Sequence, residues 1–125
     1  MTQTTETQTQ FERLGGTEGC TAIASAIMDR HLANPIIKDH FAKIEDIQKA
    51  KDNVRDFFSM GTGGPAQYQG QDMRTAHAGM NLNERDLVAV IDDVLAVLDE
   101  REIGAEARAE VLTILYTFKE EVLFQ

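Results

Sequence analysis

The chain has 125 residues, of which 42% are hydrophobic, and this is enough for one domain with a single modest core. Asp and Glu number 21 against 12 Lys and Arg, which gives a formal net charge of −9. Because an acidic surface repels phosphate backbones and anionic lipid headgroups, neither nucleic-acid nor membrane binding is expected. Cys20 is the single cysteine, which excludes an internal disulfide and any multi-cysteine metal site and fits a reducing, cytoplasmic location.

The N-terminal residues 1–10 are rich in Thr and Gln and contain neither a basic nor an apolar stretch. We therefore expect a disordered polar tail there rather than a secretory signal. The folded domain is expected to span residues 11–125. Since no apolar run approaches the roughly 20 residues that a membrane-spanning helix needs, we expect a soluble protein, and we expect it to be monomeric.

The first long helix is expected over residues 17–33, where apolar residues recur at three- and four-residue spacing. Thr17 offers a side-chain oxygen that caps its start, and Gly15-Gly16 separates it from a short apolar turn at 11–14. Asn34-Pro35 ends the helix, because proline disfavours helical geometry in the residue before it.

The clearest helical periodicity lies in residues 46–60, after a short helical turn that ends near His40 and Phe41. Residues 61–72 contain four glycines and one proline, so they end this helix and form a loop. Only a short helix around residues 72–78 is available after the loop. The buried stripe of the 46–60 helix is expected to consist of Ile47, Ala50, Val54, Phe57 and Phe58.

Two further helices are expected over residues 83–100 and 105–124. Asn83 caps the first of them, and Asp86 adds a favourable negative charge near its amino end. No useful alternation of apolar and polar residues occurs, so no strand is predicted and the fold class is all-α. The buried faces are expected to contain Leu87, Val90, Ile91, Val94, Leu95 and Leu98 in the first helix, and Val111, Ile114, Leu115, Phe118 and Val122 in the second.

His77 is the candidate functional residue, because it stands on a short helix after a glycine-rich loop that a simple helical bundle does not need. For a histidine taken alone, a surface or satisfied core position is the commoner case. A haem iron needs one protein nitrogen because the porphyrin supplies four others, whereas zinc or non-haem iron needs several side chains. His31 and His40 lie on separate segments. The pattern therefore favours a haem iron ligated by His77.

Six short motifs follow one another along the chain: Phe11-Glu12-Arg13-Leu14-Gly15-Gly16, Asp29-Arg30-His31-Leu32-Ala33-Asn34-Pro35, His40-Phe41, Asn53-Val54-Arg55-Asp56-Phe57, Gly63-Gly64-Pro65-x-x-Tyr68-x-Gly70 and Met73-Arg74-x-x-His77. In this order they resemble group I of the truncated haemoglobins, and the resemblance covers residues 11–124. It implies a globin-like two-over-two helical sandwich around haem b. The expected helix pairs are then 17–33 with 46–60 and 83–100 with 105–124.

The resemblance also implies roles for individual residues. His77 matches the proximal ligand of the haem iron, and Phe41 matches a phenylalanine that packs flat on the porphyrin. Lys49 is a candidate partner for a haem propionate, although an ordinary solvated lysine is equally expected. The remaining expected haem contacts are Ile47, Phe57, Tyr68, Met73, Arg74, Leu82, Leu87, Val90, Ile91 and Leu115.

The distal side, where the gas binds, departs from the family pattern. Most members have a tyrosine that hydrogen-bonds oxygen, whereas this chain has Met28, preceded by Ile27 in place of a phenylalanine. Two positions that commonly bring a glutamine or leucine over the ligand match Ala50 and Val54. Since none of these side chains is a strong donor, we expect fast oxygen dissociation. The expected distal pocket comprises Ile27, Met28, Ala50, Asn53 and Val54.

Two alternatives on the distal side stay open. A helix register shifted by one residue would aim Lys49 and Asn53 at the iron, but it would turn an apolar face outward. In the absence of gas, Met28, Lys49 or a displaced His31 could serve as an internal sixth ligand. A methionine at a packed helical position is more often simply part of the core.

The sequence thus predicts a haem protein that reversibly binds O2, NO or CO at iron held by His77, with oxygen transport or NO detoxification as its role. Conversion of NO to nitrate by bound oxygen would make the protein a nitric oxide dioxygenase. That reaction needs an external reductase as electron donor, so enzyme activity is left open. The alternative function is a helical interaction module without haem.

Overall fold

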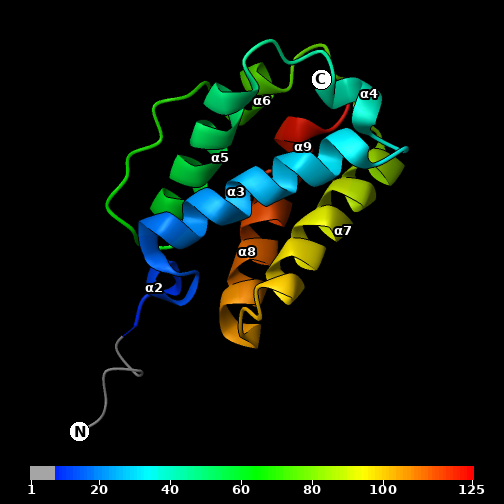
Figure 1. The fold of residues 1–125 in the computed structure, drawn as a ribbon. Coiled ribbons are helices and arrows are strands. Elements are labelled where there is room, and N and C mark those ends of the chain that lie inside the picture. The colour runs from blue at the N-terminus through cyan, green and yellow to red at the C-terminus, as the bar shows by residue number, and fades with distance from the viewer. Residues whose placement is uncertain (1–7) are drawn as a thin grey trace, which may run out of the picture.

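The computed structural model describes residues 8–125, and in this range the chain is helical without strands. An isolated parallel bridge joins Leu82 to Leu123. Figure 1 shows two helix pairs that cross each other, with the C-terminus beside α6. The arrangement is the expected all-α, two-over-two sandwich.

The polar tail expected at residues 1–10 falls mainly on residues 1–7, which lie outside the described range. Its last residues take part in the fold, because α2 (Gln10–Arg13) begins one residue before the expected domain boundary. Thr9 and Glu12 cap this helix reciprocally: the Thr9 hydroxyl accepts the Glu12 N–H at 3.1 Å, and the Glu12 carboxylate accepts the Thr9 N–H at 2.8 Å.

The first helix pair consists of α3 (Gly16–Ala33) and α5 (Ile47–Gly61), with α4 (Lys38–Phe41) between them in the chain. The prediction that Thr17 caps α3 is wrong. Gly15 occupies the cap position with φ +100°, a left-handed conformation that glycine adopts without steric cost, so the helix starts before Thr17. The carboxylate of Asp46 caps α5 by accepting the Lys49 N–H at 3.0 Å.

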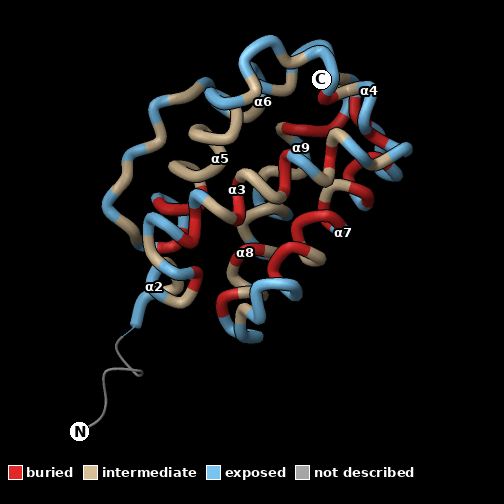
Figure 2. The backbone as a smooth tube through the Cα atoms, in the orientation of Figure 1, coloured by how far each residue is buried: buried red, intermediate tan, exposed pale blue. Residues whose placement is uncertain are grey.

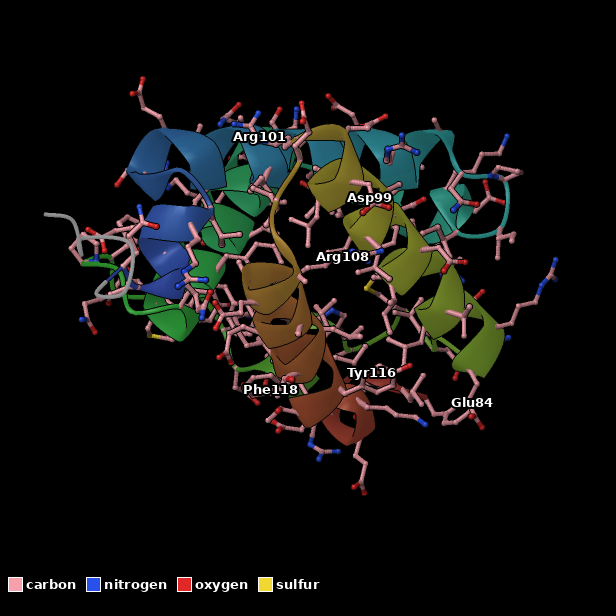
Figure 3. The ribbon with its side chains drawn as sticks, turned by 90° about the horizontal axis from the view of Figure 1, so that it is seen from below. Glu84, Asp99, Arg101, Arg108, Tyr116 and Phe118 are labelled. Carbon is pink, nitrogen blue, oxygen red and sulfur yellow. The ribbon has the colours of Figure 1, made fainter. Side chains whose placement is uncertain are left out.

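The second pair consists of α7 (Glu84–Glu100) and α8 (Ala105–Thr117). The predicted cap of α7 is confirmed, because Asn83 accepts the Asp86 N–H at 2.8 Å. Seen from below, α7 and α8 lie side by side, and Asp99 pairs with Arg108 at 3.2 Å (Figure 3).

The single helix predicted over 105–124 is wrong, since α8 ends at Thr117 and a short α9 (Lys119–Val122) follows. Contacts with a remote segment of the chain explain the break. The Phe124 N–H donates to the Leu82 carbonyl at 2.8 Å, and the Gln125 carbonyl accepts the Asn81 N–H at 2.9 Å. These bonds hold the C-terminal residues beside the start of α7, and α9 packs on α6 (Met73–Ala76).

The main core lies among α3, α5, α7 and α8. Most of its buried residues come from α3 and α7, whereas most of α5 has intermediate burial (Figure 2). Full burial of each large aliphatic side chain contributes about 1.5–3 kcal/mol to stability. A second apolar cluster lies at the other end of α3 and forms part of the wall of the site described below. The main core contains Leu14, Cys20, Ile23, Ile27, Phe58, Val94, Val97, Leu98, Ala107 and Val111.

Candidate functional site

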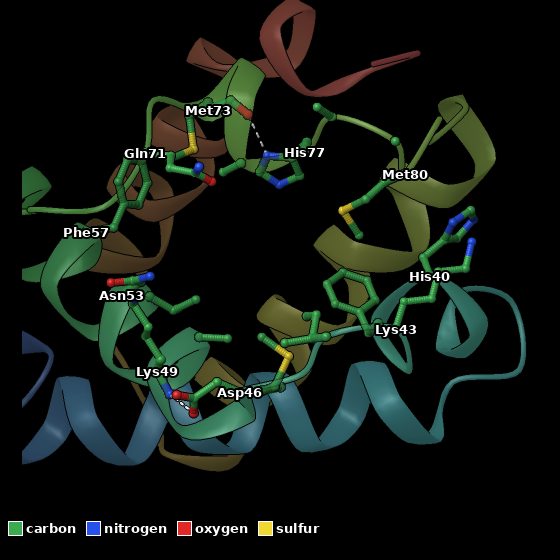
Figure 4. Close-up of a pocket in the computed structure, with 18 of the residues that line it drawn as sticks. His40, Lys43, Asp46, Lys49, Asn53, Phe57, Gln71, Met73, His77 and Met80 are labelled. Atoms are coloured by element: carbon green, nitrogen blue, oxygen red, sulfur yellow. Dashed lines mark hydrogen bonds between the residues drawn. The ribbon is translucent and has the colours of Figure 1, made fainter.

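A cavity of about 510 Å3 opens among α3, α4, α5 and the segment around α6. Its volume is in the usual range for sites that hold a cofactor or another small ligand. Figure 4 shows His77 on one side of the cavity, with Lys49 and Asp46 on the opposite side. The residues expected from the sequence that line it are Met28, Phe41, Lys49, Ala50, Asn53, Val54, Phe57, Tyr68, Met73 and His77.

The ring of His77 is oriented by the helix that precedes it. His77 ends α6, and its Nδ1 lies 2.8 Å from the Met73 carbonyl oxygen one turn earlier. A carbonyl only accepts hydrogen bonds, so Nδ1 carries the proton and Nε2 keeps its lone pair. The half-buried ring projects into the cavity (Figure 4), which leaves Nε2 as a nitrogen available to a metal.

The loop before α6 is fixed by aromatic packing against α5. The Tyr68 ring meets the Phe57 ring edge-on with centroids 5.7 Å apart, and the Tyr68 hydroxyl donates to the Gln71 carbonyl at 2.6 Å. Partial burial, with a smaller contribution from the charge of Asp72, raises the pKa of Tyr68. A Cβ at Gly70 would lie 2.5 Å from the Tyr68 hydroxyl oxygen, so glycine permits this close approach.

The wall that α5 contributes is broader than the sequence suggested. Both the apolar residues Ala50 and Val54 and the polar residues Lys49 and Asn53 border the cavity, and Phe57 continues the face. The buried stripe of a helix commonly covers 100° or more, so neighbouring positions can share a face. The sequence offered two registers for this helix, one with Ala50 and Val54 facing the site and one with Lys49 and Asn53 facing it. In the structure, a single orientation of α5 brings all four side chains to the cavity.

Phe41 lines the cavity and packs on a buried polar group behind it. Its ring lies 4.6 Å from the His31 ring, centroid to centroid, and the His31 Nδ1 lies 2.8 Å from an Asp93 carboxylate oxygen. The Asn34 amide also donates to Asp93, at 3.1 Å. Desolvation lowers the pKa of His31, although the hydrogen bond and charge of Asp93 act to raise it. His31 does not line the cavity, so reaching an iron there would require breaking its contact with Asp93.

Eight expected site residues do not line the cavity. Leu87, Ile91 and Leu115 pack with Leu123 in a cluster of their own, and Leu82 is fully buried beside Leu123. The reason is the break after α8, which brings the C-terminal residues over positions that were expected to face the haem. The others are Ile27 in the main core, Ile47 and Val90 in the second apolar cluster, and Arg74, which donates to the Gln125 side chain at 3.4 Å.

Several cavity residues were not expected from the sequence. His40 pairs with Asp86 at 3.3 Å, while Lys43 is an exposed cation at the same cavity as Lys49. Met80 follows His77 by three residues and also lines the cavity. Its closeness to His77 in the sequence could have identified it as a site residue. The complete set is His40, Lys43, Ile44, Asp46, Gln71, Ala76, Ala78, Gly79 and Met80.

Within residues 8–125, no group of three or more His, Cys, Asp or Glu side chains is arranged to hold a metal ion. One available imidazole on a mostly apolar cavity instead suits an iron that brings its own equatorial ligands, as haem does. None of the helices in the described part of the chain is long and apolar enough to cross a bilayer.

Comparison with known proteins gives matches over nearly the whole chain. Residues 9–124 match the bacterial-like globin family. A group 1 truncated haemoglobin of Tetrahymena pyriformis is 31% identical over 93% of this chain and 95% of its own, and the group 1 protein GlbN of Synechocystis sp. is 32% identical over 85% of this chain and 88% of its own. The crystal structure of the Tetrahymena pyriformis truncated haemoglobin in the Fe(III) form superposes with a TM-score of 0.87 at 29% identity, covering 94% of this chain and 100% of that one.

Proposed function

Because this chain belongs to the bacterial-like globin family, among the group 1 truncated haemoglobins, we propose that it binds haem b beside His77 and uses it to bind O2, NO or CO reversibly. Membership of a globin family implies a haem cofactor. The observation that carries the proposal is the orientation of His77, whose Nδ1 is held by the Met73 carbonyl while the ring faces the cavity.

The donor set of the cavity fits this cofactor. His77 would ligate the iron through Nε2, while Phe41, Ile44 and Met80 would contact the porphyrin. Lys43 and Lys49 are exposed at the cavity and would pair with the two propionates. When bound, ferrous haem supplies an open coordination position for a diatomic gas.

The distal side favours rapid exchange of the gas. Met28, Ala50 and Val54 line the cavity and offer no strong hydrogen-bond donor, whereas O2 bound to ferrous haem carries partial negative charge. A donor worth about 1–3 kcal/mol slows oxygen loss by roughly tenfold to a hundredfold. We therefore propose that oxygen dissociates faster, and is favoured less over CO, than it would be with a tyrosine in place of Met28.

Oxygen transport and NO detoxification are the two roles that suit such a site. Nitric oxide dioxygenation consumes one NO and one O2, releases nitrate and leaves the cofactor oxidised by one electron. It can turn over only with an external reductase. The two roles are separated by adding NO to the oxygenated protein with and without a reducing system and counting the nitrate formed per haem.

Absorption spectra test the proposal directly. The purified protein should take up one equivalent of hemin with a Soret band, and ferric, ferrous and CO-bound spectra should report a histidine-ligated haem. The variant His77→Ala should lose the ferrous histidine-ligated spectrum. A colourless wild type that does not take up hemin would instead support a helical interaction module and overturn the proposal.

We also propose that the protein acts as a cytoplasmic monomer. Cys20 is fully buried, and burial raises its pKa to about 11, so the thiol stays protonated and shielded from disulfide exchange. Size-exclusion chromatography with light scattering under non-reducing conditions should give the monomer mass. A concentration-dependent dimer would contradict this.

A further inference from the structure

We infer that Asn53 donates a hydrogen bond to the gas ligand and sets how long oxygen is retained. The inference rests on the proposed function, because it needs haem in the cavity. Asn53 is half-buried, stands on the α5 wall of the cavity, and is a neutral side chain with two N–H donors.

The other polar side chains of the cavity have partners or lie in solvent. His40 pairs with Asp86. The Tyr68 hydroxyl donates to the Gln71 carbonyl, and Gln71 itself is exposed. The Asp46 carboxylate accepts the cap hydrogen bond of α5.

Asn53 differs from these groups in its surroundings. Within residues 8–125, the carboxamide of Asn53 has no hydrogen-bond partner. Its neighbours on the cavity wall, Ala50 and Val54, are apolar, so they do not compete for its N–H groups. A polar group beside an apolar wall gains most from a partner that enters the cavity, because water screens it less there.

The position of Asn53 along α5 also separates it from the lysines. Lys49 stands one turn earlier and is exposed, and Phe57 stands one turn later (Figure 4). The Phe57 ring packs against Tyr68. Asn53 is therefore more buried than the cationic side chain, and it shares the cavity wall with the small Ala50. A short carboxamide that is already half-buried also loses less conformational entropy on binding than a lysine.

A hydrogen bond from Asn53 should affect bound O2 more than bound CO. The outer atom of bound O2 accepts a hydrogen bond well because of its partial negative charge, while bound CO carries little charge. An amide donor should thus slow the loss of O2 and leave the loss of CO nearly unchanged. It should also lower the C–O stretching frequency of the CO complex, because a donor near the oxygen atom increases electron donation into the C–O antibonding orbital.

The test compares four haem-loaded proteins: the wild type, Asn53→Leu, Asn53→Asp and the control Gln48→Leu. Gln48 is exposed on the same helix, away from the cavity, and its amide pairs with Asp52. Stopped-flow mixing gives the O2 and CO dissociation rates, and infrared spectra give the C–O stretch. We expect O2 dissociation to be about fivefold to tenfold faster in both Asn53 variants and unchanged in the control. The C–O stretch should rise in Asn53→Leu.

The outcomes separate this inference from the proposed function. If the wild type takes up hemin but Asn53→Leu changes neither the O2 rate nor the C–O stretch, the role of Asn53 is wrong and the haem assignment stands. If Asn53→Leu alone changes the O2 rate, while the equally sized aspartate does not, the side chain acts by its volume and the inference is also wrong. If the wild type takes up no hemin, both ideas fail.

Discussion

The Nδ1 atom of His77 lies 2.8 Å from the carbonyl oxygen of Met73, one helical turn earlier in the chain. This contact fixes the tautomer of the imidazole, because a carbonyl oxygen can only accept the Nδ1 proton. Hydrogen bonds of this kind orient metal-ligating histidines and raise the basicity of the nitrogen that faces the metal. A single short helix thus positions the ring and, under the proposed function, would strengthen Nε2 as a ligand.

Replacing His77 by glycine should remove the iron ligand and leave a space that free imidazole can fill. We expect hemin affinity to fall by at least about tenfold, and added imidazole to restore the histidine-type ferrous spectrum. Absorption spectra during an imidazole titration measure both effects. His40→Gln is the control, because His40 also borders the cavity but is paired with Asp86, and it should keep the ligated spectrum. Loss of the ligated spectrum in His40→Gln would show that the wrong histidine was chosen.

Replacing Met28 by tyrosine should make the protein hold oxygen longer. Met28 is buried and lines the cavity, so a hydroxyl there would add a hydrogen-bond donor that methionine lacks. Oxygen dissociation should slow by roughly tenfold to a hundredfold in stopped-flow measurements. Met60→Tyr, the same change at an exposed position of α5 away from the cavity, should leave the rate unaltered. If the wild type already lost oxygen as slowly as Met28→Tyr, the added hydroxyl would have no effect and this prediction would be wrong.

Replacing Lys49 by methionine distinguishes its two expected roles. As an exposed propionate partner, Lys49 should contribute about 0.2–1 kcal/mol, so hemin loss to an acceptor globin should speed up by at most about fivefold. As an internal sixth ligand, it should instead give the wild type a low-spin ferric spectrum that Lys49→Met abolishes. Lys51→Met is the matched control, because Lys51 pairs with Asp29 at 3.1 Å rather than bordering the cavity. A rate that changes equally in both variants would exclude a specific role for Lys49.

The long helices could be predicted from the sequence because each has a local signal. The apolar stripe of α5 and the capping residue Asn83 of α7 act within a few residues, and the observed bounds fall within about one residue of those expected. The start of α3 was misjudged because its cap depends on the positive φ of Gly15 rather than on a side chain. Local patterns therefore predicted the architecture but not every helix end.

The walls of the site could be predicted only in part. His77, Phe41 and the α5 residues were found because they belong to recognisable motifs. The placement of Leu87 and Leu115 was missed because it depends on the C-terminal residues, which are held by the hydrogen bond from Phe124 to Leu82. This contact joins residues far apart in the chain, so helical periodicity, which is a local pattern, cannot predict it.

The buried pair of His31 and Asp93 should make stability depend on pH. Desolvation lowers the pKa of His31 below 6.5, so its imidazole stays neutral in the fold at a pH where the unfolded chain already binds a proton. The stabilisation from neutral His31 is complete above pH 6.5 and is lost as the pH falls toward the lower pKa of the folded state. The loss from this group is at most about 1.4 kcal/mol per pH unit.

The variant His31→Gln tests this dependence, because glutamine can still donate to Asp93 but does not titrate. Urea unfolding at pH 7.5, 6.5 and 5.5 should give a free energy of unfolding that falls more steeply in the wild type than in the variant. All other residues are the same in the two proteins, so the difference between the slopes reports on His31. Parallel slopes would show that His31 protonates equally in the folded and unfolded chains.

Gly19 should be among the least replaceable residues of the helical scaffold. A Cβ at this position would lie 2.0 Å from the Leu14 carbonyl oxygen, which is backbone and cannot rotate away. Gly19→Ala must therefore push α2 away from α3, and we expect a loss of about 2–3 kcal/mol in urea unfolding, as in other overpacked sites. Gly104→Ala is the matched control, because its Cβ meets no atom within 4 Å and its φ of −67° suits any residue, so its effect should stay within about 0.5 kcal/mol. Equal stability of the two variants would mean that the approach of Leu14 to Gly19 is not a constraint on this fold.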